Sequence, residues 1–241
     1  MIQTVETSAR MVARADLTSD DLACMYGLLS CYFKGVTREH FQSDLAEKNW
    51  AILIERAGRI VGFTTILAYE THFDGDPISV IYSGDTIVAP EAWNSQTLPR
   101  AWIESVAALR AEYPRGLYVW LLITSGFRTY RFLPVFWRSF FPRYDCQTPP
   151  RWKHLIETLS QERFGEQYDP IKGIVKLRHP QRLNDQLVGI PPGRCDDPHV
   201  GFFASSNPGH TSGDELVCLT ELSPENLTSA GRRMASVFPQ W

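Results

Sequence analysis

The sequence predicts an α/β fold in which helices pack on one mixed, largely antiparallel sheet. Two observations predict it. Strand-like and helical segments alternate along the first 145 residues, with three consecutive strand-like runs in the middle, and 44% of the 241 residues are hydrophobic. We expect a single domain over 1–241, with a core at about 10–145 and a C-terminal helix, loop and hairpin at 146–241.

The N-terminal part is expected to form a strand followed by two helices. Residues 10–15 resemble a short strand. Thr18 precedes two acidic residues and then apolar residues at helical spacing, which indicates a capped helix. Gly35 ends this helix, and Thr37 caps a second amphipathic one.

The central part is expected to be a three-stranded meander. Residues 50–55 and 60–69 are separated by an Ala-Gly turn and form a hairpin. A turn at 74–77 leads into a strand at 78–88. Gly84 lies inside that last strand pattern, which indicates a bulge or a close approach of the backbone.

The next segments are a loop, a helix, a buried strand and another helix. Residues 90–99 form the loop, and Pro99 suits the first turn of the helix that follows. Residues 116–124 are apolar almost throughout, as in a strand buried on both faces. Residues 128–140 are expected to be helical, with Pro134 causing a kink or a late start.

The C-terminal part is less regular. We expect a helix at 152–164, a strand at 174–177, a long loop at 179–198 that forms a lid or plain surface, a strand pair at 199–204 and 215–222, and a last helix near Met234.

Composition excludes several classes of protein. The net charge of -3 gives no general case for nucleic-acid binding. The five cysteines are scattered without metal-ligand spacing, so we expect no metal site, and no signal peptide or apolar span is evident. The cytoplasm is therefore the expected location. A basic cluster at 128–153 is open to two interpretations, a solvated helix face or a surface for an anionic partner.

Three segments resemble motifs of the GNAT superfamily, the Gcn5-related N-acyltransferases. They are 60–65 (IVGFTT), 86–91 (TIVAPE) and 126–130 (GFRTY), within a resemblance that covers about 10–145. The resemblance implies a GNAT-like acyl-CoA N-acyltransferase fold whose fourth and fifth strands separate. It further implies transfer of an acyl group from a thioester donor to a small amine by direct attack.

One loop departs from the family pattern. The segment 93–99 has no glycine, whereas the family has a glycine-rich loop that holds the pyrophosphate of coenzyme A. Three interpretations are open: side chains replace the missing donors, an acyl carrier protein supplies the acyl group, or the protein is a binding or regulatory module or runs another reaction in the same cleft. The candidate donor-binding residues are Val88, Asn94, Ser95, Gln96, Thr97, Arg100, Thr124 and Ser125.

The resemblance also suggests residues for the chemistry. Asp85 is the candidate general base and Ser83 a candidate to hold a water molecule, while Tyr130 is the candidate general acid. Each has a structural alternative: a bulge aspartate, a strand serine and a core tyrosine. Candidates for binding the acceptor are His72, Arg128, Arg131, Asn207 and His210.

Overall fold

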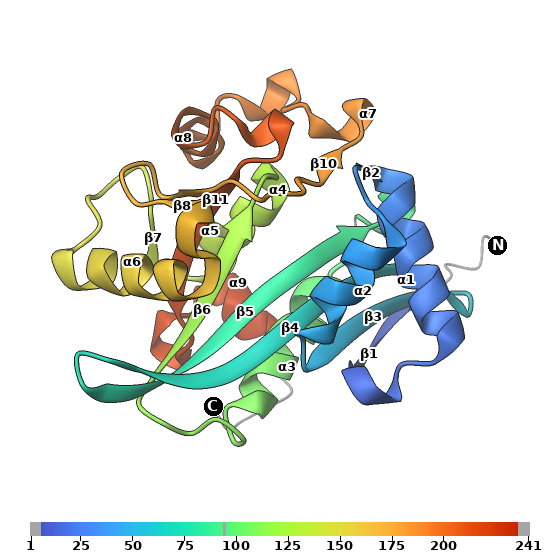
Figure 1. Ribbon diagram of the computed structural model, residues 1–241, viewed down its shortest axis with the longest axis horizontal. Helices are drawn as coiled ribbons and strands as arrows, with labels where there is room; N and C mark the ends of the chain where they lie inside the picture. Colours follow the sequence, from blue (N-terminus) through green and yellow to red (C-terminus); the bar gives the residue numbers. More distant parts are fainter. Residues whose placement is uncertain (1–5, 94, 236–241) are drawn as a thin grey trace.

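The computed structural model describes residues 6–93 and 95–235, and its described strands form one large mixed sheet and a small two-stranded one (Figure 1). The large sheet has the order β1-β3-β4-β5-β6-β11-β9-β8, and β7 pairs with β11 off this path. Its strands are β1 (Thr7–Ala13), β3 (Trp50–Arg56), β4 (Arg59–Phe73), β5 (Asp76–Val88), β6 (Leu117–Thr124), β7 (Phe140–Phe141), β8 (Tyr168–Asp169), β9 (Ile174–Val175) and β11 (Glu215–Glu221). β2 (Phe33–Lys34) and β10 (Arg182–Leu183) form the small sheet.

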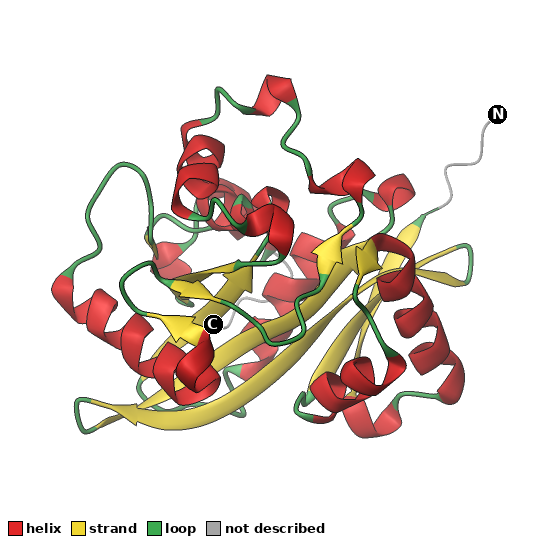
Figure 2. Cartoon of the chain, turned by 45° about the horizontal axis from the view of Figure 1, so that its top comes forward, coloured by secondary structure: helices red, strands yellow, loops and turns green. Residues whose placement is uncertain are grey.

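Helices cover both faces of the large sheet (Figures 1 and 2). One face carries α1 (Ser19–Tyr32), α2 (Arg38–Ala46) and α6 (Pro150–Phe164). The other carries α3 (Thr97–Leu109), α4 (Phe127–Tyr130), α5 (Phe132–Phe136), α8 (Pro198–Ser206) and α9 (Ser229–Met234). The short α7 (Asp185–Val188) follows β10. None of the helices within the described ranges has the length and apolar character needed to cross a membrane.

The two apolar cores, one on each face of the sheet, follow from the alternation of side chains along each strand. In β3, Ile52 and Ile54 belong to the apolar core on the α3 face, whereas Ala51 and Leu53 belong to the core under α1 and α2. Successive residues of a strand point to opposite faces, so one apolar run supplies both cores. The strand predicted at 116–124 behaves in the same way and is confirmed as β6.

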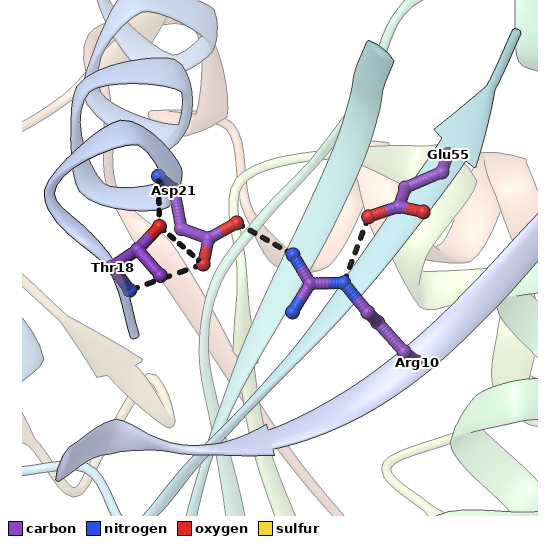
Figure 3. Close-up of polar contacts among 4 residues, drawn as sticks. All are labelled: Arg10, Thr18, Asp21 and Glu55. Carbon is purple, nitrogen blue, oxygen red and sulfur yellow. Dashed lines mark hydrogen bonds and ion pairs between the residues drawn. The ribbon is translucent and has the colours of Figure 1, made fainter. Parts of the chain in front are cut away.

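The first helix is fixed to the sheet by a polar network (Figure 3). Thr18 and Asp21 form a capping box, in which each side chain accepts a hydrogen bond from the backbone N–H of the other. The guanidinium of Arg10 on β1 pairs with Asp21 at 2.5 Å and with Glu55 on β3 at 2.8 Å. The predicted cap at Thr18 is therefore confirmed, and it links α1 to two strands.

The separation of β5 from β6 is the feature that creates the site. These strands pair in parallel from Ile78–Leu117 to Ser83–Leu122, and beyond Ser83 β5 pairs only with β4. The β4–β5 register shifts between Thr64 and Ile66, so one extra residue bulges from β5 at the predicted position. All other pairings in the large sheet are antiparallel. This is the GNAT-like topology that the sequence predicted.

In the second half, the strand pair predicted at 199–204 and 215–222 was wrong, and the helix predicted at 128–140 is confirmed only in part. Residues 199–204 form helix α8 instead of a strand, because Asp197 caps the helix by accepting from the His199 N–H and Pro198 occupies the first turn. The hairpin expected there is absent, since β11 pairs with β6, β7 and β9. The helix predicted at 128–140 is two short helices, α4 and α5, with Pro134 in the first turn of α5.

The start of the β5–β6 pair depends on Gly116, and this gives a stability prediction. Gly116 has φ +55°, and a Cβ there would lie 1.8 Å from the Pro77 carbonyl oxygen. Gly116→Ala should therefore lower the free energy of unfolding by about 3 kcal/mol, through steric overlap and an unfavourable φ. Gly58→Ala is the matched control, because Gly58 has φ +71° with no atom within 4 Å of its Cβ position. It should cost about 1 kcal/mol. Equal losses in urea denaturation would contradict the steric explanation.

Candidate active site in the gap between β5 and β6

A cavity of about 780 Å³ occupies the gap where β5 and β6 separate. Its walls include the end of β5 from Tyr82 to Val88 and the end of β6 with the turn that follows it. On one face of the sheet it is lined by α2 and the segment 177–183. On the other it is lined by α3, α4 and the loop before α3. The gap thus joins two arms on opposite faces, which we call the polar arm (α2 side) and the aromatic arm (α3 side).

Two carboxyl groups lie in the polar arm. Asp85 is in the β5 bulge and Glu215 is the first residue of β11, and both line the cavity. Desolvation raises the pKa of Asp85, an effect to which the negative charge of Asp44 adds and which Lys48 opposes. Desolvation also raises the pKa of Glu215, helped by the charge of Asp85 and opposed by hydrogen bonding with Ser125. Both carboxyl groups therefore keep their protons to higher pH than solvated carboxyl groups do.

A buried lysine lies directly behind the bulge. Lys48 is 2% exposed, and its Nζ donates to Asp44 Oδ1 at 2.7 Å and to the Asp44 carbonyl oxygen at 3.0 Å. A Cβ on Gly84 would lie 2.5 Å from Lys48 Cε, so only glycine allows this approach. The bulge and close approach predicted at Gly84 are confirmed. The cation lies beside Asp85 and favours the ionised form of that carboxyl group.

Other polar groups complete the polar arm. The guanidinium of Arg163 stacks on the Tyr82 ring at 3.9 Å and pairs with Glu47 at 3.1 Å. His40 and His179 stack on each other with ring centres 4.0 Å apart. Asp44 Oδ2 is buried and has no hydrogen-bond partner among the residues that the structure describes. This arm therefore offers carboxylate oxygen to a cationic group.

The segment that covers the polar arm is fastened to the end of α1 and to β2. β10 pairs with β2, and Lys34 forms an ion pair with Asp185 at 2.7 Å. Asn184 Nδ2 donates to the carbonyl oxygen of Cys31 at 2.6 Å. The cover thus depends on contacts between parts of the chain some 150 positions apart.

The aromatic arm is mainly apolar. Its lining includes Leu98, Trp102, Trp120, Phe127, Phe132, Leu187 and Val188. Trp102 and Trp120 lie with ring centres 4.2 Å apart, and both rings contact Phe132. Trp93 is 40% exposed, and the guanidinium of Arg128 lies over its ring at 4.4 Å. Arg128 also lines the cavity, so one cation flanks an otherwise apolar channel.

The loop before α3 does not form a cradle for a pyrophosphate. The hydroxyl groups of Ser95 and Thr97 bond to each other at 2.6 Å, the Thr97 N–H donates to Ser95 Oγ, and Pro99 has no N–H. Among the described donor-binding candidates between positions 88 and 100, Val88 and Ser95 line the cavity. The Val88 carbonyl oxygen already accepts a hydrogen bond from Trp93 Nε1 at 2.7 Å. Gln96, Thr97 and Arg100 do not line it, and Asn94 lies outside the described residues.

The turn after β6 does contribute to the cavity. Thr124 and Ser125 both line it. The Thr124 hydroxyl accepts from the Gly126 N–H at 3.0 Å and donates to the Gly126 carbonyl oxygen, so it fixes the turn. Ser125 interacts with Glu215 and thereby connects the end of β6 with the start of β11. Ser125 is therefore the better placed of the two for contact with a ligand.

Several candidates are not part of the cavity lining. Tyr130 is fully buried and its hydroxyl donates to the Pro142 carbonyl oxygen at 3.0 Å, so it does not face the gap. Arg131 pairs with Asp197 at 2.9 Å. Asn207, also fully buried, donates to the backbone at Thr124 and Asp214 and fixes the end of α8.

The two candidate histidines also lie elsewhere. His72 is exposed and pairs with Pro77, eight residues before Asp85, which is about 26 Å along the strand at ~3.3 Å per residue. His210 follows α8 and contacts Phe203, and it is not part of the cavity lining. The expected late hairpin would have brought His210 and Asn207 to the acceptor, and that hairpin does not form.

Sequence reasoning missed Glu215, Asp44 and Lys48. Glu215 directly precedes the apolar run 216–219, and a charged residue at that position is a usable signal. Lys48 follows the second helix and resembles a solvated surface residue, so nothing in the sequence marks it as buried. No group of three or more His, Cys, Asp or Glu side chains within 6–93 and 95–235 is placed to hold a metal ion.

Comparison with known proteins finds distant and partial similarity to solved structures. No family model and no curated protein matches the sequence. The chain is similar to a probable N-acyltransferase from Enterococcus faecalis V583 (14% identity, TM-score 0.41) and to a GCN5-related N-acetyltransferase from Kribbella flavida (14%, 0.39). Each match covers 52% of this chain and only about a third, 31% and 32%, of the other.

A third structure, a GNAT family N-acetyltransferase from Escherichia coli in complex with CoA, has 12% identity and a TM-score of 0.38 over 54% of this chain and 68% of its own. At such similarity no activity is transferred from these proteins. The description of the fold as GNAT-like rests on the strand order and on the separation of β5 from β6.

The carboxyl pair predicts how stability depends on pH. The pKa is raised to about 7 for Asp85 and to about 8 for Glu215, above their values in an unfolded chain. The folded protein then binds more protons than the unfolded chain between about pH 5 and pH 8, so the free energy of unfolding falls as the pH rises through this window. Glu215→Gln should remove part of that fall and stabilise the protein at pH 8 by about 1 kcal/mol, allowing for solvent screening.

The control for this prediction is Glu221→Gln, at the other end of β11 and outside the cavity lining. It should leave the pH dependence of urea unfolding unchanged. A Glu215→Gln variant that is less stable than the wild type at pH 8 and equal to it at pH 5 would contradict the raised pKa.

Proposed function

We propose that this protein transfers an acyl group from a thioester donor to a small amine, by direct attack of the amine in the gap between β5 and β6. The observation that carries the proposal is the cavity that passes through this gap, with an apolar arm on one face of the sheet and two carboxyl groups of raised pKa on the other. A reaction between an apolar acyl donor and a cationic amine is favoured by a site with one apolar side and one acidic side.

The polar arm suits the amine. A primary amine is an ammonium ion at neutral pH and attacks only after it loses a proton. Asp85 in its ionised form accepts that proton, and Asp44 Oδ2 is an unpartnered acceptor close to the same place. Glu215, whose pKa is raised as well, retains a proton at neutral pH and limits the repulsion between the two carboxyl groups.

The reaction balances with these groups. The amine nitrogen forms a bond to the thioester carbonyl carbon, and the carbon–sulfur bond breaks. The nitrogen loses two protons in all: the ammonium form gives one to Asp85 before attack, and the second passes to the departing thiolate through the site or solvent. Asp85 then releases its proton to solvent, so the products are an amide, a free thiol and one proton. No covalent bond to the protein is needed, and within the described chain no cysteine lines the cavity.

The aromatic arm suits the acyl-thioester end of the donor. Acyl-CoA is the donor that we propose, with Arg128 as the cation available to its phosphates. The hydroxyl groups of Ser95 and Thr97 at the start of α3 bond to each other, and that of Thr97 also contacts the Thr7 carbonyl oxygen, which specifically favours a second candidate in which an acyl carrier protein presents the thioester. A carrier needs a cation for one phosphate and no cradle for a nucleotide.

The first test is calorimetric titration with acetyl-CoA, octanoyl-CoA and CoA, followed by a thiol-release assay with a panel of primary amines. Binding of octanoyl-CoA together with amine-dependent thiol release supports acyl-CoA as donor. Transfer only from an acyl carrier protein supports the second candidate. If no donor binds and none releases thiol, the acyltransferase proposal is overturned, and a binding role remains for the cavity.

Asp85→Asn should reduce kcat/KM by about 10²-fold, since the general base is removed. In the wild type, kcat/KM should rise with pH until Asp85 is ionised, near its pKa of about 7. Asp76→Asn, an exposed change of the same kind at the start of β5, is the matched control and should retain full activity. Unchanged turnover in Asp85→Asn would remove this residue from the mechanism.

Lys48→Met tests the electrostatic part of the mechanism. The buried cation favours the ionised form of Asp85, and its removal also leaves Asp44 without its partner. Both changes raise the pKa of Asp85, so the rise of kcat/KM should move to higher pH in the variant while activity at high pH is largely retained. A rise that stays at the wild-type pH would show that Lys48 does not act on the base.

A further inference from the structure

Ser83 receives two hydrogen bonds from tryptophan side chains. Its Oγ accepts from Trp102 Nε1 at 3.2 Å and from Trp120 Nε1 at 2.9 Å. Trp102 comes from α3 and Trp120 from β6, so two separate elements direct N–H groups at one hydroxyl oxygen. Ser83 itself is only 3% exposed and lines the cavity.

The two indoles determine what the hydroxyl group can still do. A serine hydroxyl has two acceptor lone pairs and one proton to donate, and an indole N–H only donates. With both lone pairs engaged, the remaining hydrogen-bonding capacity of Ser83 is its proton. An ordinary serine can turn to accept or donate, and this one is restricted to donating.

Ser83 also has the right location for contact with the donor. It is the last residue of β5 that pairs with β6, so it lies where the gap opens. It faces the aromatic arm, because its partners Trp102 and Trp120 belong to the apolar core on the α3 face. The polar arm with Asp85 and Glu215 lies beyond the bulge on the opposite face.

We infer that Ser83 is a catalytic residue that donates a hydrogen bond to the thioester group of the acyl donor, and that Trp102 and Trp120 are positioning residues that enforce this direction. The inference rests on the proposed acyl transfer. Negative charge develops on the thioester as the amine attacks. A fixed donor in a site with little water stabilises that charge more than it stabilises the ground state. Ser83 keeps its own proton throughout.

The same aromatic cluster offers a matched control. Trp137 is 1% exposed, and its ring centre lies 5.2 Å from that of Trp120 and 5.7 Å from that of Trp102. Its Nε1 has no hydrogen-bond partner among the described residues. Trp137→Phe and Trp120→Phe therefore remove similar volume from one cluster, and only the second removes a hydrogen bond to Ser83.

The test measures kcat, KM and thermal unfolding for Trp120→Phe, Trp137→Phe, Ser83→Ala and the double variant Trp120→Phe/Ser83→Ala, with octanoyl-CoA and the fastest amine of the panel. Ser83→Ala should lower kcat by about 10²-fold. Trp120→Phe should lower kcat by about 5-fold with little change in KM, and Trp137→Phe by less than about 2-fold. In the Ser83→Ala background, Trp120→Phe should have no further effect on kcat, because the hydroxyl that it positions is absent.

Equal kcat in the Trp120→Phe and Trp137→Phe variants would overturn the inference, as would an undiminished effect of Trp120→Phe without the Ser83 hydroxyl. The tryptophan comparison decides the matter even if Ser83→Ala is too unstable to purify. The proposed function fails separately, by absence of amine-dependent thiol release in the wild type. A wild type that turns over and variants that break this pattern would leave the function standing and remove only the role of Ser83.

Discussion

The parallel pairing of β5 with β6, and its end at Ser83, is the constraint on which the rest of the structure depends. It is the one parallel contact in the large sheet of the described chain. Parallel strands require a crossover, which α3 supplies, and this places α3 with Trp102 over the gap. If the pairing continued to Thr124, the backbone groups that now face the cavity would be occupied by ladder hydrogen bonds.

The bulge in β5 adds chemistry to this geometry. One extra residue opposite Thr65 lets Gly84 pass close to Lys48 and directs Asp85 toward the α2 side. Two carboxyl groups and one buried ammonium ion then share a poorly solvated space, an arrangement that lowers stability and suits proton transfer. The core beneath them is extensive and tolerates this cost, since apolar clusters fill both faces of the sheet.

Sequence patterns predicted the elements up to the end of β6 well because local signals there agree with one another. The Thr18 cap, the turn at Asp74-Gly75 and the apolar run of β6 each specify their element by local chemistry alone. The apolar run at 199–204 is short enough to suit either a strand or a helix. The Asp197–Pro198 cap decides for the helix, and hydrophobic periodicity alone does not reveal it. Glu215 and Lys48 join Asp85 only through long-range pairing, which spacing in a sequence does not reveal.

For the proposed acyl transfer, the aromatic arm offers a way to bind a thioester although the loop before α3 departs from the GNAT pattern. Affinity for a nucleotide requires backbone donors at the N-terminus of α3, and here Ser95, Thr97 and Pro99 leave few of them. Apolar burial against Trp102, Trp120 and Phe132 supplies an alternative source of binding energy, which increases with the length of the acyl chain. Within the proposed function, the donor is therefore recognised mainly by its acyl group, and long acyl chains are favoured over acetyl because each further methylene buries more apolar surface in the same arm.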